Sequence, residues 1–472
     1  MTAVLVARSR PWQPESSRLA MRGRLVLSLR AGEDPARIPA HRDVLHGHAA
    51  AATRIDGGPI DQVLARFSDR LRVARVFSAA QGLARRGERH LGFDDVEHDL
   101  GLSRAFRLDV DPDTSIVPLV HELGARATVE SVSPHYLCEA PFSAGPGQHS
   151  PSAAVDYARA MVGAAEALAL EPGDESVIVG VIDSGVRARH PELVGRLRPG
   201  LDTVDLPKDQ VSRGLDLFGD TTGRDRDPDD EVGHGTACAA ILAACGRDLP
   251  PGLAGLSRVL PIRALAGAML AERTTPTAVG GLPDIDEGVK AAVDLGARVL
   301  NLSFGTPESA LRDDDPIPHI ETIRYALARG CVLIAASGNS GDAVRYFPAA
   351  LPGVIAVGAV DERRAPCKFT TRGDHVALCA PGANIRSAGL DGYSVQNGTS
   401  FAAPFVAAAC ALLLARGLRA STLFGAPTIR ELLVASAAPF PSGDAHGCGA
   451  GILDLPAALR AADNRLNSDW GA

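Results

Sequence analysis

Lysine and aromatic residues are scarce in this chain of 472 residues. Lysine occurs only at positions 208, 290 and 368, and aromatic residues make up 4% of the sequence. The formal net charge is −8 and the arginines are scattered, so we expect no nucleic-acid partner. With few aromatic residues, the core must be built from Ala, Val, Leu and Ile, and a hydrophobic content of 46% is typical of a globular protein.

The chain also lacks a long apolar segment near its N-terminus and any CxxC spacing. The run "LVLSL" at 25–29 is too short for a secretory signal, so we expect a cytoplasmic location. The apolar run 401–415 is shorter than a membrane span and contains Pro404, which favours a buried helix. We expect no membrane association. Five of the eight cysteines lie in apolar runs and indicate reduced thiols: Cys238, Cys245, Cys331, Cys379 and Cys410.

From about residue 177, short apolar runs alternate with amphipathic segments. This alternation predicts an α/β domain with a doubly wound parallel sheet covered by helices on both faces. The expected strands are 177–182, 259–265, 299–303, 332–336, 354–360 and 376–380. The expected helices are 235–244, 285–295, 320–328, 402–415 and 429–437.

The first part of the chain has a different pattern. Strand (24–29), helix (60–71), strand (73–78), strand (106–110), helix (114–123) and strand (128–137) follow one another, with a charged, Gly-containing insertion at 81–103. This order predicts a smaller N-terminal α+β domain of the ferredoxin-like kind. We expect this domain at 1–142, a connector and first segment at 143–174, the larger domain at 175–460 and a tail at 461–472.

Three residues at the ends of expected elements could carry chemistry together. Asp183 closes a strand, His234 stands in "VGHGTACAAILAA" at the start of a helix, and Ser400 precedes the apolar run in "NGTSFAAP". Taken singly, Asp183 could be a turn residue, and Thr399 or Ser400 an N-cap. Taken together, the order Asp, His, Ser is one of the known orders of a catalytic triad. The chain has no Gly-x-Ser-x-Gly, which excludes an α/β-hydrolase, and no Gly-x-Gly-x-x-Gly after the strand, which excludes dinucleotide binding.

Several further segments support this triad in a fixed order along the chain. They are "VIVGVIDSGVRARHPEL", "GHGTACAAILAA", "VLNLSFGTP", "LIAASGNSG", "YFPAALPGVIAVGAVD", "APGANIRSAGLDGYSVQNGTSFAAPFVAAACALLL" and the closing "GCGAGILDLPAAL". Across about 175–455 the chain resembles the subtilases, the subtilisin-like serine peptidases. The resemblance implies that Asp183 orients the imidazole, His234 acts as general base and then acid, and Ser400 is the acylated nucleophile.

The resemblance also implies further site residues. Asn339 matches the asparagine of the oxyanion hole, which acts with the Ser400 backbone N–H. A start of the helix at Ser400 would itself favour developing negative charge. An extended peptide or protein substrate would lie between two segments, and its backbone pairing would demand little of its sequence. These substrate-binding residues are Ser303, Phe304 and Gly305 on one side and Ala336, Ser337 and Gly338 on the other.

The chain departs from the family pattern at several positions. Phe401 stands where a methionine usually follows the nucleophile, and this change keeps the bulk of the side chain. Glu192 replaces a common calcium-binding aspartate, and "ACGRDLPPGLAG" lacks the Asn-rich ligand loop, so we assign no metal ligands. We expect no cofactor, and the ligands of any calcium ion stay unassigned. The acidic loop 225–231 could hold a divalent cation or favour basic peptides, but its pattern is more typical of a solvated surface loop.

The N-terminal domain resembles a subtilase propeptide in its strand order and in its final segment, "VESVSPHYLCEA". The resemblance implies an intramolecular chaperone and inhibitor that is cleaved within 137–151; a plain accessory domain is the alternative. The sequence thus predicts a serine endopeptidase that works through an acyl-enzyme. Two alternatives stay open: a catalytically idle scaffold that binds peptides, and a processing peptidase or ligase dedicated to one partner.

Overall fold

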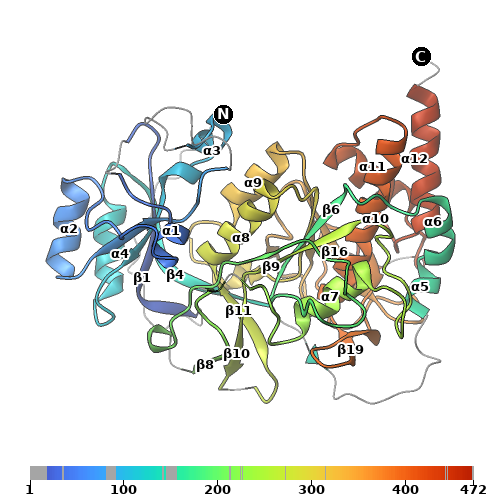
Figure 1. The fold of residues 1–472 in the computed structure, drawn as a ribbon, viewed down its shortest axis with the longest axis horizontal. Helices are drawn as coiled ribbons and strands as arrows, with labels where there is room; N and C mark the ends of the chain where they lie inside the picture. Colours follow the sequence, from blue (N-terminus) through green and yellow to red (C-terminus); the bar gives the residue numbers. More distant parts are fainter. Residues whose placement is uncertain are drawn as a thin grey trace.

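The computed structural model describes residues 19–33, 37–80, 92–140, 143–144, 157–211, 214–223, 225, 227–271, 273–313, 315–441, 443 and 445–469. Figure 1 shows two units side by side, an N-terminal unit (residues 19–140) and a larger C-terminal unit (residues 157–469). Within the predicted connector and first segment (143–174), residues 145–156 lie outside the described residues.

The C-terminal unit is built on a sheet of seven parallel strands in the order β17-β16-β14-β12-β6-β9-β7. The chain starts near the middle at β6 and extends the sheet in both directions, which makes it doubly wound. The strands are runs of Val, Ile, Leu and Ala because both faces of the sheet are buried. They comprise β6 (Ile178–Asp183), β7 (Leu201–Asp202), β9 (Arg258–Arg263), β12 (Val299–Leu302), β14 (Val332–Ala336), β16 (Val354–Val360) and β17 (Val376–Pro381).

Helices cover both faces of this sheet, and alternate residues of one strand belong to different cores. Val179 and Val181 of β6 pack in the core beneath α7 and α10, whereas Ile178 and Ile182 pack in the core beneath α8 and α9. The first face carries α7 (His234–Ala243), α10 (Thr399–Arg419), α11 (Ala426–Ser436) and α12 (Leu455–Asp469), with α5 (Tyr157–Met161) and α6 (Ala164–Leu170) beside them. The second face carries α8 (Leu282–Asp294) and α9 (Ile320–Ala328), which face the N-terminal unit in Figure 1.

Helix α10 is the central helix of the unit. It packs against β12, β14, β16 and β17 and against α7 and α12. Among the described residues, α10 is the one helix long and apolar enough to cross a membrane by length and composition, but 89% of its apolar window is buried inside the protein.

The N-terminal unit is an antiparallel sheet in the order β2-β3-β1-β4 with two main helices. The helices α2 (Pro59–Phe67) and α4 (Ile116–Gly124) close a small apolar core on the side away from the C-terminal unit (Figure 1). The strands are β1 (Ala20–Leu29), β2 (Arg72–Arg75), β3 (Ala105–Asp109) and β4 (Val129–Ala140), and a short helix α1 (His41–Leu45) precedes α2.

The sheet of the N-terminal unit continues into the C-terminal unit. Strand β4 pairs with β11 (Thr277–Gly281), which pairs with β10 (Ala266–Leu270) and then β8 (Leu215–Phe218). One seven-stranded sheet therefore runs through both units. The two units share backbone hydrogen bonds as well as side-chain contacts.

The charged insertion predicted at 81–103 contains a short helix that contacts the C-terminal unit. Residues 81–91 lie outside the described residues, whereas the short helix α3 (Asp95–Asp99) begins with a capping box made by Asp94 and Glu97. Asp94 pairs with Arg329 and Glu97 pairs with Lys290, both in the C-terminal unit. Charged residues of the described part of this insertion therefore pair with the C-terminal unit.

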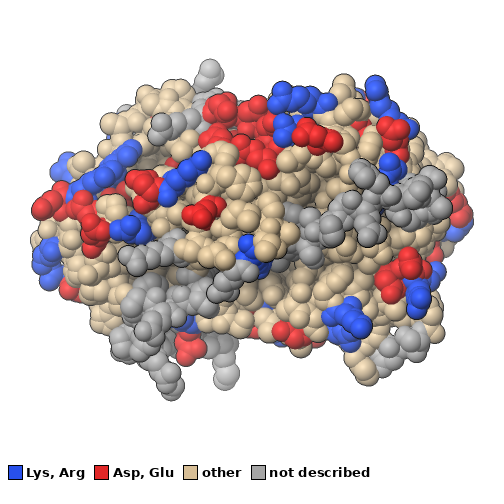
Figure 2. All heavy atoms as spheres, turned by 90° about the horizontal axis from the view of Figure 1, so that it is seen from below, with Lys and Arg blue, Asp and Glu red and all other residues tan. Residues whose placement is uncertain are grey.

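Each of the eight cysteines, all within the described residues, is a free thiol. Seven are buried, but Cys245 is exposed, so its placement inside an apolar element was wrong. It follows the end of α7 at Ala243, where the chain turns toward the surface. On the face shown in Figure 2, acidic and basic side chains are interspersed among the described residues.

Candidate active site

The carboxylate of Asp183 and the imidazole of His234 form a buried pair at one end of the parallel sheet. Asp183 is the last residue of β6 and His234 is the first residue of α7. His234 Nδ1 lies 2.6 Å from Asp183 Oδ1, and neither side chain is exposed. Strand β6 lies between β9 and β12, where the direction of sheet extension reverses, and this is where doubly wound sheets place their sites.

The loop that leads into His234 is organised by the buried carboxylate of Asp230. This carboxylate accepts hydrogen bonds of 2.6–2.9 Å from both sides of the loop. The donors are the hydroxyls of Ser184 and Thr236 and the backbone N–H groups of Val232, Gly233 and Thr236. Asp230 therefore joins the residue after Asp183 to the first turn of α7, and so fixes the separation of the Asp183–His234 pair.

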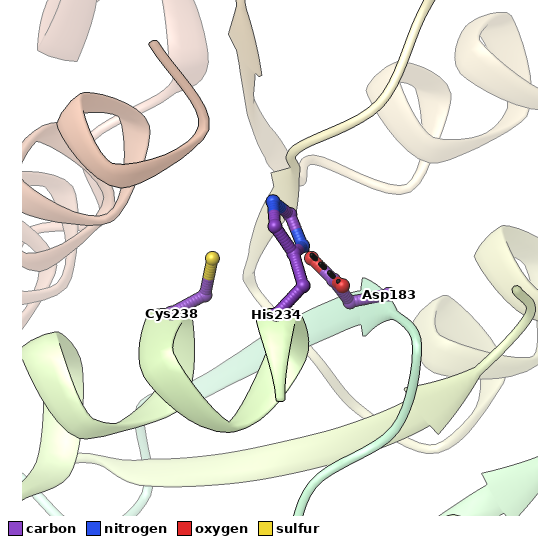
Figure 3. Close-up of side chains that lie close together, drawn as sticks. All are labelled: Asp183, His234 and Cys238. Atoms are coloured by element: carbon purple, nitrogen blue, oxygen red, sulfur yellow. Dashed lines mark hydrogen bonds and ion pairs between the residues drawn. The ribbon is translucent and has the colours of Figure 1, made fainter. Parts of the chain in front are cut away.

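Figure 3 shows His234 turned toward Asp183, with Cys238 one helical turn further along α7 on the same side. Ligand atoms of these three residues lie within 4.8 Å of one another, which is close enough to hold a cation. Burial raises the pKa of the Cys238 thiol well above its usual value, and a metal ligand would have to be the thiolate. The geometry therefore suits an imidazole oriented by a carboxylate better than a metal centre.

Ser400 lies in the first turn of α10, next to the Asp183–His234 pair. The helix begins at Thr399 and its N-cap is Gly398, whose φ of 147° favours glycine. The alternative of Thr399 or Ser400 as an N-cap was therefore wrong, because both residues are already helical and Gly398 makes no side-chain cap. Ser400 Oγ donates to the Ser303 carbonyl at 3.2 Å.

Contacts between α7 and α10 bring Ser400 and His234 together. The Ser400 carbonyl accepts hydrogen bonds from the Ser303 hydroxyl at 2.9 Å and from Cys238 Sγ at 3.5 Å. The ring of Phe401 lies 5.2 Å from the His234 imidazole, centroid to centroid. Phe401, noted above as a departure from the family pattern, therefore packs on the imidazole.

The Asn339 side chain is oriented from α10. Its Oδ1 accepts hydrogen bonds from the Thr399 backbone N–H at 2.9 Å and from the Thr399 hydroxyl at 3.0 Å. With Oδ1 engaged in this way, the amide nitrogen is held near Gly398, where a Cβ would lie 3.2 Å from Nδ2. The arrangement therefore presents an N–H donor beside the start of α10.

Five of the six predicted substrate-binding residues line one small hollow together with Ser400 and Asn339. They are Ser303, Phe304, Gly305, Ala336 and Gly338. The Ser337 hydroxyl instead donates to the Thr371 carbonyl and is buried outside the hollow. Tyr346 and Thr399 complete the lining and were not predicted, although Tyr346 opens the motif "YFPAALPG".

The last strand of the N-terminal unit occupies the edge beside this hollow. Residues 137–140 of β4 pair antiparallel with β11, and the Gly305 N–H donates to the Glu139 carbonyl at 3.3 Å. Residues 141–142 lie outside the described residues, and after them β5 (Ser143–Ala144) pairs with Asn397 and Gln396 of β19 (Tyr393–Asn397), just before Ser400. The described residues on each side of 141–142 thus pair with segments that lie near Ser400.

Glu192 stands where the family commonly has a calcium-binding aspartate, and its carboxylate holds the loop after α7. Glu192 is buried, and its oxygens accept hydrogen bonds from the backbone N–H groups of the loop that follows α7. Burial alone would raise the pKa of Glu192, but these four donors lower it to about 2. The donors are Gly246, Arg247, Asp248 and Leu249. A loop with its N–H groups turned inward does not offer the carbonyl oxygens that calcium needs.

A second acidic cluster joins Asp202, Asp220 and Asp225, whose ligand atoms lie within 4.8 Å of one another. The buried carboxylate of Asp202 already lies 2.5 Å from the Arg263 guanidinium, which supplies the positive charge there. We therefore assign no metal to this cluster.

Comparison with known proteins identifies the family. The model of the subtilase family matches residues 174–451, which is more than half of the chain. The chain belongs to the subtilase family. All the residues of the candidate site in the C-terminal unit lie within this match.

Similar subtilases are serine proteases. The chain is 35% identical over 250 residues to the thermophilic serine proteinase of Bacillus sp. (strain AK1), covering 52% of this chain and 54% of that protein. It is 32% identical over 248 residues to thermitase of Thermoactinomyces vulgaris, covering 52% of this chain and 77% of that protein. Among solved structures, a protease from Pseudoalteromonas arctica PAMC 21717 matches with a TM-score of 0.54 and 25% identity, covering 66% of this chain and 98% of the other.

The aligned region covers about half of the length of the first of these relatives. The family model matches only residues 174–451, so the N-terminal unit lies outside it. The part of the chain that matches the subtilase family is therefore the parallel-sheet unit, and the N-terminal unit is interpreted from its own contacts.

Proposed function

We propose that this subtilase is a serine endopeptidase that hydrolyses peptide bonds in peptide or protein substrates through an acyl-enzyme. The observation that carries the proposal is the buried hydrogen bond of 2.6 Å between His234 Nδ1 and Asp183 Oδ1, with Ser400 in the adjacent first turn of α10. Because the carboxylate holds one imidazole nitrogen, the tautomer that leaves Nε2 as a base toward the nucleophile is favoured.

In the proposed reaction, His234 takes the proton of Ser400 Oγ as that oxygen attacks the substrate carbonyl. The tetrahedral intermediate collapses when His234 gives the proton to the leaving amine, and the C–N bond breaks. Water then attacks the acyl-enzyme with His234 again as the base, which releases the acid product and restores Ser400. Asp183 stabilises the imidazolium in both steps.

The negative charge that develops on the substrate oxygen needs fixed donors. We assign this role to the Asn339 amide and the Ser400 backbone N–H. The two hydrogen bonds from Thr399 that hold Asn339 Oδ1 support this role, since they fix the amide before substrate arrives. The N-terminus of α10 adds a favourable helix dipole at the same place.

We further propose that the N-terminal unit is a ferredoxin-like, propeptide-like inhibitor of its own C-terminal unit. Its strand order β2-β3-β1-β4 supports this role, as does the pairing of β4 with β11 and Gly305. Backbone pairing at 137–140 leaves little room on that edge for an extended substrate. The same pairing is also compatible with the alternative, a catalytically idle scaffold whose substrate-binding edge is permanently covered by the N-terminal unit. A peptidase or ligase dedicated to one partner and a location in the cytoplasm stay predictions.

The test is intact-mass spectrometry of the wild type and of Ser400→Ala, before and after treatment with a fluorophosphonate serine-hydrolase probe. We expect the wild type to carry the probe on Ser400 or to be shortened between residues 137 and 151. The Ser400→Ala variant should remain full-length and unlabelled. Full-length, unlabelled protein in both samples, under conditions that release the N-terminal unit, would favour the closed scaffold.

A further inference from the structure

The hollow beside Ser400 is closed on its far side by the ring of Tyr346. The lining includes Ser400 and Asn339, the segment Ser303–Gly305, and Ala336 and Gly338, and it ends at Tyr346. Its cavity volume of about 10 Å³ has room for roughly one water molecule, far below the ~300–1,000 Å³ of ordinary ligand pockets. A substrate carbonyl held between Ser400 Oγ and Asn339 would have its own side chain, the P1 side chain, directed into this hollow.

The Tyr346 ring fills the space between the two segments that would border a substrate. A Cβ on Gly338 would lie 2.5 Å from Tyr346 Cδ2, and a Cβ on Gly305 would lie 3.3 Å from Tyr346 Cδ1. The ring therefore rests against the backbone of both segments, and both contacts depend on glycine. The volume that a large P1 side chain would need is already occupied by the protein.

The position of Tyr346 is fixed by its strand. Tyr346 belongs to β15 (Tyr346–Phe347), which pairs antiparallel with β13 (Thr306–Pro307), so that Tyr346 lies opposite Pro307. Strand β13 follows directly on Gly305, and the pairing therefore ties the ring to the segment that borders the hollow. The ring is half-buried, and burial raises the pKa of its phenol.

We propose that Tyr346 determines specificity by restricting the P1 residue to small side chains such as glycine and alanine. The inference rests on the proposed function, because it concerns the substrate of the same site. A mismatch of about one methylene in a closed pocket changes specificity roughly 10- to 200-fold. We therefore expect at least a tenfold preference for alanine over phenylalanine at P1.

The test uses the full chain and covalent probes that differ only in the P1 side chain. N-acetyl α-aminoalkyl diphenyl phosphonates with an alanine-like or a phenylalanine-like side chain carry no residues N-terminal to P1, so they do not need the edge that β4 occupies. Labelling of Ser400 is followed by intact mass for the wild type, Tyr346→Ala and the matched control Tyr346→Phe. A simple alkyl fluorophosphonate, which has no P1 side chain, reports the reactivity of Ser400 by itself.

We expect the wild type and Tyr346→Phe to react at least tenfold faster with the alanine-like probe, and Tyr346→Ala to lose or reverse this preference. Equal rates with both probes in the wild type would overturn the proposal without any variant being needed. A full preference retained in Tyr346→Ala would also overturn it. If the fluorophosphonate labels Ser400 in these cases, the proposed function stands while the specificity does not. Absence of labelling by every probe would overturn both.

Discussion

At the residue scale, the orientation of Asn339 is set by a residue sixty positions later in the sequence. Both hydrogen bonds to Asn339 Oδ1 come from Thr399, and the Thr399 hydroxyl also contacts the backbone of Gly338. Because Thr399 is the first residue of α10, it shares one helix terminus with the proposed nucleophile, Ser400. A change at Asn339 should therefore affect the reaction rather than the fold.

We expect Asn339→Ala to lower the turnover of a peptide substrate about 100- to 1,000-fold, since it removes one donor to the oxyanion. The measurement is kcat on a chromogenic peptide with a small P1 residue, together with the midpoint of thermal unfolding. The matched control is Asn464→Ala, the same substitution at an exposed position of α12. Turnover equal to the wild type in Asn339→Ala would remove this residue from the mechanism.

The candidate residues that the sequence indicates are those with distinctive chemistry in a motif. Asp183, His234 and Ser400 each stand at the end of an element where a turn residue would be ordinary, and only their order along the chain suggests a triad. The sequence gives no such signal at Thr399 and Tyr346, because hydroxyl and aromatic side chains serve many ordinary structural purposes. Their roles are inferred from their neighbours in the structure, which are Asn339 for Thr399 and the glycines 305 and 338 for Tyr346.

At the scale of single elements, the loop of residues 246–249 is held by one side chain. Four backbone N–H groups point at the buried carboxylate of Glu192 from the segment that follows α7. The Tyr393 hydroxyl, on β19, lies 3.3 Å from the same carboxylate. Glu192 therefore joins the end of α7 to the β18–β19 hairpin, in which β18 (Ile385–Ala388) pairs with β19.

We expect Glu192→Gln to lower the free energy of unfolding by about 1.5–3 kcal/mol at neutral pH, because the amide replaces one acceptor oxygen by a donor and removes the charge. The pKa of Glu192 is lowered from 4.5 to about 2 in the folded protein. Its contribution is therefore fully present above about pH 4.5 and is lost as the pH falls toward 2. Chemical denaturation measures the free energy of unfolding of the variant and of the wild type. The difference between these two free energies should decrease as the pH falls from about 4.5 toward 2.

The control is Glu175→Gln, which removes an exposed carboxylate whose side chain is 63% accessible and pairs with Arg258. This variant should stay close to the wild type at every pH, since exposed ion pairs contribute little. A Glu192→Gln difference that stays constant from pH 6 to pH 3 would contradict the assignment.

Helices and strands with a strong apolar pattern are well predicted from the sequence. Strands that depend on hydrogen-bonded partner strands for their stability are not. Strands β14 and β16 and helix α9 have the bounds that the sequence predicts. Strands β10 ("AGAML") and β11 ("TAVGG") were not predicted, because alanine and glycine have low strand propensity. They form as strands because β8 and β4 supply partners on either side.

At the scale of the whole molecule, ion pairs with little exposure fasten the two units together. Arg107 lies 2.5 Å from Asp284, and Arg24 lies 2.9 Å from Asp205. Each of these four side chains is at most 8% exposed. Charges buried in this way are tolerable only when paired, so the pairs favour one arrangement of the units over others.

We expect Arg107→Met to destabilise the protein by about 3–5 kcal/mol, because it leaves the Asp284 carboxylate buried without its partner. Chemical denaturation of Arg107→Met, Asp284→Asn and the double variant gives the coupling free energy. The double variant should be less destabilised than the sum of the single variants. Arg107→Met should also raise the rate at which a fluorophosphonate labels Ser400, since β4 is held less firmly.

The matched control is Arg22→Met, which removes a pair with Asp113 whose side chains are 49% and 92% exposed. This exposed pair should contribute less than about 1 kcal/mol. Additive effects of Arg107→Met and Asp284→Asn would show that the two charges do not act as a pair.

The sequence by itself determined the parallel-sheet unit, because buried strands and amphipathic helices leave periodic patterns that follow from local geometry. It also determined the family, since the motifs around Asp183, His234 and Ser400 keep their order. Only the tertiary structure decided that β4 continues the sheet into β11, that Thr399 orients Asn339, and that Tyr346 closes the hollow. These contacts join residues far apart in the chain, and their strength comes from burial and hydrogen-bond geometry, which no local pattern records.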